Sequence, residues 1–343
     1  MEMTSFFKTL PSRCPALKVL SINIRNLGYG EATTDALSCA IPNFKEVHRL
    51  AVHNPRLDNA ALRHLAMSPR LTQLIITSQQ SQVEELALPL SDTPFSGIKE
   101  LDVSLLDLGS IAGLLRPEGQ AFSIAELHLD SSPTANTMHS FLTALASQPR
   151  QSSLTSVTLD EITSHTHPMD DISYDLSHDT LQPLTFLRSL RELRISLDNH
   201  ISLNDAELAG LARGWPLLQV LELDSINGSS SERVTLRGLL LLSVTCPNLK
   251  QVMLSLDSRK VPMTGPRVGA DVCGATLETM AFRRSPINDP HLVAAFLLTY
   301  FPSIIGVTYW HSSSVPDSYV ERWRQVQQYL DRKNEVSLAL CVS

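Results

Sequence analysis

The stretch Trp215-Pro216-Leu-Leu218-Gln-Val-Leu221-Glu-Leu223 decides the fold, because its last six residues have the form L-x-x-L-x-L. Apolar residues at alternate positions predict a short strand with one buried face. The same form returns along the chain, with other apolar residues sometimes replacing leucine. It begins at residues 17, 47, 71, 98, 124, 154, 190, 218, 249, 277 and 304. Because the pattern recurs at nearly constant spacing along the sequence, it predicts a repeat architecture.

Helical patterns separate these strands. A capping residue followed by apolar residues at helical spacing occurs at 58–67, 137–146, 204–212, 235–244 and 289–301. A proline often closes the helix and precedes the next strand, as at Pro15, Pro69, Pro216, Pro247 and Pro302. Proline cannot continue a helix, and it favours extended backbone at the residue before it. The predicted unit is therefore a helix, a proline stop, a short strand and a loop.

Stacking of this unit predicts a single α/β solenoid. Strands that are joined through helices and share one register must be parallel, and helices are wider than the spacing between strands. The array is therefore expected to curve, with the parallel sheet inside and the helices outside. We predict about 11 repeats over residues 1–315, with loop-like stretches at 79–97 and 163–179. The segment 316–343 is predicted to form a capping helix and tail, because residues 319, 320, 323, 326 and 330 are apolar.

Composition excludes several classes of protein. The chain has 343 residues, of which 43% are hydrophobic, so it can bury a large core. Its formal charge of −7 argues against binding nucleic acid or an anionic membrane through bulk charge. Five cysteines do not suggest a disulfide framework, and neither a secretory signal nor an 18-residue apolar run is visible. We therefore expect an intracellular protein, cytoplasmic or nuclear.

The sequence offers no catalytic signature. It lacks the G-x-S-x-G, G-x-x-x-x-G-K-[ST], G-x-G-x-x-G and H-E-x-x-H motifs, so no enzyme activity, cofactor or metal site is predicted. The one metal-like cluster, around His165 and His167, has no recognisable ligand spacing and is interpreted as a polar loop. Cys14 and Cys246, each before a proline stop, are predicted to be buried core residues.

Alternate strand residues should point away from the core, onto the concave face of the sheet. In repeats 4–8 many of these residues are acidic, and other charged or aromatic residues complete the candidate partner-binding set. The set is Glu100, Asp102, Glu126, His128, Asp130, Asp160, Glu192, Arg194, Glu222, Asp224, Arg283 and Trp310. Like charges on neighbouring strands repel unless water or a basic partner relieves them. Two interpretations follow: a docking strip for a basic protein segment, or a surface that only confers solubility. Trp310 is either a binding anchor or packs against the C-terminal helix.

The Cys/Trp-Pro-x-Leu-x-x-Leu-x-Leu pattern resembles the leucine-rich repeats of fungal-type F-box proteins, over roughly residues 5–312. An F-box itself is not found. The resemblance implies the substrate-recognition part of a ubiquitin ligase receptor. It implies a Skp-type adaptor and a cullin as partners only if an F-box lies upstream.

The resulting functional hypothesis is a non-catalytic protein–protein interaction scaffold that binds a protein partner, with a basic segment, on its partly acidic concave face. Neither nucleic acid nor membrane is an expected partner. The alternative is a repeat-type inhibitor or regulator of another protein, with no role in ubiquitination.

Overall fold

The computed structural model describes residues 3–23, 31–53, 57–77, 98–104, 108, 124–129, 132–147, 154–161, 174–225, 234–262, 276–309 and 316–342. The predicted loop at 79–97 and residues 163–173 of the second predicted loop lie outside these ranges. The chain divides into two compact units. Unit 1 comprises Met1–Pro133 and Thr137–Thr163, and unit 2 comprises Thr134–Asn136 and Ser164–Ser343.

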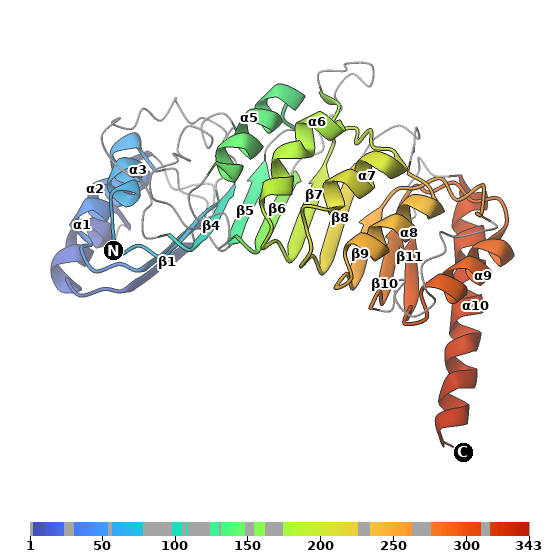
Figure 1. Cartoon of the computed structure of the whole chain (residues 1–343). Helices are drawn as coiled ribbons and strands as arrows, with labels where there is room; N and C mark the ends of the chain where they lie inside the picture. The colour runs from blue at the N-terminus through green and yellow to red at the C-terminus, as the bar shows by residue number, and fades with distance from the viewer. Residues whose placement is uncertain are drawn as a thin grey trace. The chain divides into compact units, whose positions relative to one another are not determined.

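The described part of unit 1 contains a parallel sheet whose strand order follows the sequence (Figure 1). Its strands are β1 (Val19–Asn23), β2 (Arg49–His53), β3 (Gln73–Thr77), β4 (Glu100–Ser104), β5 (Ile124–Leu129) and β6 (Ser156–Glu161). Its helices are α1 (Met3–Arg13), α2 (Glu31–Ala40), the short 3-10 helix η1 (Ile41–Asn43), α3 (Asn59–Ala66) and α5 (Ala135–Ala146).

The described part of unit 2 repeats the same organisation, again with parallel pairing in sequence order. Its strands are β7 (Glu192–Leu197), β8 (Val220–Ser225), β9 (Gln251–Leu254), β10 (Thr279–Phe282) and β11 (Gly306–Tyr309). Its helices are α6 (His178–Leu181), η4 (Gln182–Phe186), α7 (Asp205–Ala212), α8 (Leu236–Thr245), α9 (Pro290–Tyr300) and α10 (Asp317–Val342). The predicted α/β repeat architecture, with short parallel strands separated by helices, is confirmed.

The inward leucines form ladders across neighbouring strands. In unit 1, Leu50, Leu74 and Leu101 occupy the same register position on β2, β3 and β4. In unit 2, Leu193 and Leu221 begin an equivalent ladder that continues through β9, β10 and β11. All of these ladder side chains are buried. Each repeat therefore buries its apolar face against the next one, which is why the unit must recur to be stable.

A recurrent turn explains the proline stops. The amide of the first apolar residue of the L-x-x-L-x-L pattern donates to the carbonyl three residues earlier, as in Leu218 N to Trp215 O at 3.2 Å and Leu249 N to Cys246 O at 3.1 Å. The same bond joins Ile304 N to Phe301 O at 3.1 Å. The intervening proline fixes one φ angle of this turn and donates no hydrogen bond. Where a proline is present it restricts this turn, but the turn does not require one: Leu190 N donates to Leu187 O at 3.2 Å with Arg188 at that place.

The structure corrects the predicted register of one repeat. The L-x-x-L-x-L pattern that begins at residue 124 predicts that Leu127 matches Leu101 and Val157. Instead, Ala125 pairs with Leu101 and Val157, while Leu127 pairs with Leu159. Every position of this repeat is therefore displaced by two residues. A strand repeats with period two, so a two-residue shift keeps each side chain on its own face, and the apolar pattern could not reveal it.

The segment predicted as an amphipathic C-terminal helix forms α10. Its Val320, Trp323, Val326 and Leu330 are buried, and α10 contacts α9 and β11. The ring of Trp323 lies 4.6 Å from the ring of Phe282, and its Nε1 donates a 2.8 Å hydrogen bond to the Ser285 carbonyl. Among the described helices, none combines the length and apolar character needed to cross a lipid bilayer.

Candidate protein-binding face

The open face is defined here as the side of each sheet whose residues alternate with the buried ladder side chains. In unit 1 it carries Glu100 and Asp102 on β4, Glu126 and His128 on β5, and Asp160 on β6. Asp102 pairs in register with Glu126, and His128 pairs with Asp160. The predicted site residues Asp130 and Trp310 lie outside the described part of the chain.

His128 links two carboxylates across three strands. Its Nδ1 contacts Oδ1 of Asp160, and its Nε2 lies 3.4 Å from Oδ1 of Asp102. The hydrogen bond with Asp160 is the main cause that raises the pKa of His128 above its ordinary value. Partial burial raises the pKa of Asp102, and the nearby His128 and His53 oppose that shift. The imidazole thus lies among the carboxylates of Asp102, Glu126 and Asp160.

Arg194 has a comparable charge-balancing role in unit 2, although it occupies a different position of its repeat from His128. It stands opposite Glu222 in the β7–β8 register, and its Nη1 lies 3.3 Å from Oε2 of Glu222. Its Nε lies 3.8 Å from Oε2 of Glu192. The side chain of Glu192 remains 46% exposed, whereas that of Glu222 is 13% exposed. Arg194 therefore neutralises part of the acidic row and leaves Glu192 accessible.

The prediction that Asp224 is an accessible binding residue is wrong. Its side chain is fully buried, and its Oδ2 lies 2.6 Å from Nη1 of Arg283. Burial is the main cause that raises the pKa of Asp224 to about 6, although Arg283 favours the charged form. Arg283 follows β10 in the sequence, so its long side chain reaches past β9 to cover the carboxylate. Arg283 is thus paired with Asp224 inside unit 2.

The acidic row is therefore partly compensated from within the chain. The sequence identified the carboxylates, but it did not identify His128, Arg194 and Arg283 as their internal partners. The Arg194–Glu222 pair follows directly from the aligned repeats. The His128–Asp160 pair depends on the corrected register. The Asp224–Arg283 pair forms because the Arg283 side chain extends past β9, and the sequence pattern does not predict that contact.

One group of side chains in the described residues has the composition of a metal site: one ligand atom each from Asp102, Glu126 and His128 lies within 4.8 Å of the others. The loop cluster of His165 and His167 falls outside the described residues. Farther along, Asp175 pairs with His200, with 3.3 Å between Oδ1 and Nδ1.

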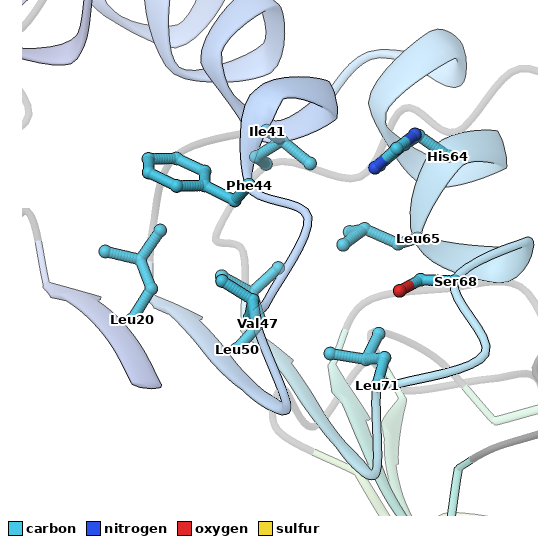
Figure 2. Close-up of a pocket in the computed structure, with 9 residues that line it drawn as sticks. All are labelled: Leu20, Ile41, Phe44, Val47, Leu50, His64, Leu65, Ser68 and Leu71. Carbon is cyan, nitrogen blue, oxygen red and sulfur yellow. The ribbon is translucent and has the colours of Figure 1, made fainter. Parts of the chain in front are cut away.

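A cavity in unit 1 lies between η1, α3 and the sheet (Figure 2). Its lining is Leu20, Ile41, Phe44, Val47, Leu50, His64, Leu65, Ser68 and Leu71. Its volume of about 10 Å³ accommodates no more than one water molecule. Burial lowers the pKa of His64, which favours the neutral imidazole in this apolar setting. This cavity is a gap in the core and offers no room for a ligand.

The two cysteines before proline stops differ. Cys246 is buried as predicted, and burial raises the pKa of its thiol to about 12. Cys14 is exposed, so the prediction that it is a core residue is wrong. It follows α1, the first helix of unit 1, and no preceding described repeat covers it.

Recurring strands and helices, joined by the same turn and the same leucine ladder, define the chain as a repeat protein of the α/β solenoid class. No family model matches the chain, and no curated protein matches it. A chain from the solved structure described as the crystal structure of the Rad7 and Elc1 complex in yeast is similar in fold, with a TM-score of 0.49 and 11% identity. That match covers 92% of this chain and 75% of the other.

Proposed function

We propose that this protein is a non-catalytic scaffold that binds a protein partner on its open face through exposed carboxylates. The observation that carries the proposal is the gathering of acidic residues on the open faces of neighbouring strands, including Asp102 and Glu126, which pair in register. Internal cations compensate only part of this charge. Glu100 is exposed, and the side chains of Asp160 and Glu192 are 39% and 46% exposed. A partner segment rich in lysine or arginine is the complement that such a surface favours.

A rigid sheet suits this role. The strand backbone is fixed by the ladder hydrogen bonds and by the buried leucines beneath it, so the carboxylates are held in place before a partner arrives. A preformed surface lowers the ordering cost of association. The sequence resemblance to fungal F-box repeats extends the proposal to substrate recognition within a ubiquitin ligase.

Affinity capture from a native cell extract tests the proposal with matched charge reversals. The test variant is Glu100→Lys with Glu192→Lys, one change on the open face of each unit. The control is Asp35→Lys with Asp179→Lys, which reverses two exposed carboxylates on the helices α2 and α6. We expect the wild type and the control to retain a partner with a basic segment, and the test variant to lose it.

The proteins that are captured distinguish the two versions of the proposal. Co-capture of a Skp-type adaptor and a cullin supports the ubiquitin ligase role, and a partner without these subunits supports a repeat-type regulator. The binding of the purified partner should also weaken as salt rises, because the contact is electrostatic. Equal capture by the wild type and the test variant would contradict the proposed role of the open face.

A further inference from the structure

The imidazole of His128 lies among three carboxylates on the open face of unit 1. Asp160 contacts one ring nitrogen and Asp102 faces the other. Glu126 contributes an oxygen within 4.8 Å of the ligand atoms of Asp102 and His128. These residues come from the adjacent strands β4, β5 and β6 (Figure 1). Even with His128 protonated, the carboxylates outnumber the imidazole, so the cluster retains negative charge.

The two nitrogens of His128 have different roles. A neutral imidazole carries only one N–H. When Nδ1 donates that hydrogen to Asp160, the lone pair of Nε2 faces Oδ1 of Asp102 at 3.4 Å. This Asp102 oxygen is sealed from solvent. Two lone pairs that face each other in a partly buried site repel, and a proton shared between them or a cation bound by both relieves that repulsion.

We propose that Asp102, Glu126 and His128 bind a divalent transition-metal cation of the zinc type, and that Asp160 is a positioning residue for the His128 ring. Imidazole combined with carboxylates suits zinc and related ions, whereas magnesium and calcium prefer oxygen ligands alone. Ligand atoms on one zinc ion lie about 3 to 4 Å apart, so side-chain rotation can close the present spacing. A carboxylate that accepts the second N–H of a ligating histidine is the usual support of such a site.

Titration of the purified full chain with Zn²⁺, followed by calorimetry, tests this site. Exposed Cys14 and Cys39 are first changed to serine, because thiolates also bind zinc. We expect saturable binding of one equivalent. The variants Asp102→Asn, Glu126→Gln and His128→Gln should each weaken binding at least as much as Asp160→Asn, whose loss of ring support is expected to cost about 10-fold to 100-fold.

His200→Gln is the matched control, because His200 also pairs with a carboxylate but lies outside the cluster. Its affinity should equal that of the parent protein. Circular dichroism of each variant separates loss of the site from loss of the fold. The three ligand variants test the metal site independently of one another. Absence of Zn²⁺ binding overturns the proposal. So does binding that survives His128→Gln but disappears with His165→Gln and His167→Gln.

The metal site and the protein-binding role can fail separately. The zinc titration uses the chain without any partner, and the capture experiment reverses Glu100 and Glu192, which lie outside the proposed ligand set. Zinc binding with unchanged capture by the charge-reversed variant would contradict only the proposed function. Partner binding without zinc binding would contradict only the metal site.

Discussion

The carboxylate of Asp224 on β8 and the guanidinium of Arg283 beyond β10 form a 2.6 Å ion pair that spans the intervening strand β9. The Asp224 side chain is fully buried, while that of Arg283 is 22% exposed. The pair therefore places a charge in the interior of unit 2 and covers it with a long side chain from two strands away. Removal of a charged group from water is costly unless a partner compensates it.

Replacement of Arg283 should destabilise the protein through Asp224. With Arg283→Ala, the buried carboxylate loses its main cationic partner, and the free energy of unfolding at pH 7.5 should fall by about 3 kcal/mol. Adding Asp224→Asn should recover most of that loss, because the remaining group is neutral. Urea unfolding of the two single variants and the double variant measures the coupling. Equal destabilisation in the single Arg283 variant and the double variant would show that the guanidinium acts only by packing.

The free energy of unfolding should depend on pH through the carboxyl group of Asp224. Its pKa in the fold is about 6, raised from 3.8, so the folded state holds this proton more tightly than the unfolded state does. The stability contribution of this group is therefore fully present below pH 3.8 and is lost as the pH rises to about 6. The shift corresponds to about 3 kcal/mol. Relative to Asp224→Asn, the wild type should lose stability between pH 4 and pH 6; a constant difference over that window would contradict the shift.

Trp323 should hold α10 onto the end of the unit 2 sheet. It is 1% exposed and packs on Phe282. Trp323→Ala should lower the free energy of unfolding by about 3–5 kcal/mol. Trp323→Phe keeps an aromatic ring but removes the hydrogen bond to Ser285, and it should cost about 1 kcal/mol. Arg332→Ala, at an exposed position of the same helix, is the control for changes on α10. Thermal and urea unfolding compare the three variants.

Two glycines in unit 2 should respond oppositely to alanine. A Cβ at Gly214 would lie 2.5 Å from the backbone of Thr185, so Gly214→Ala should destabilise the protein by about 1–3 kcal/mol. At Gly210, within α7, the nearest atom would be Nε2 of His178 at an ordinary 3.7 Å. Gly210→Ala should therefore raise stability by up to about 1 kcal/mol, through helix propensity. Similar effects at both positions, measured by urea unfolding, would contradict the close approach at Gly214.

The sequence predicted the repeat because its main signal is local. Leu218, Leu221 and Leu223 alternate within one strand, and Pro216 marks the turn before it, so a few adjacent residues suffice to predict each strand. Within each unit, every predicted repeat position except the one at 124 lies in the predicted register. The repeat at 124 was displaced because Ala125 occupies an inward position without the size of a leucine. The acidic residues of the open face were also identified, because alternation assigns a side of the sheet.

The chain's own order of apolar residues, prolines and capping residues determined that this protein is a stack of parallel strands and helices, because these signals act over a few neighbouring positions. Only the tertiary structure decided which charged side chains pair with one another. His128 pairs with Asp160 through the register of β5, and Arg283 covers Asp224 across β9, since both contacts depend on how separate strands align and how far a side chain reaches. That arrangement buries one predicted binding residue and gathers Asp102, Glu126 and His128 into one cluster.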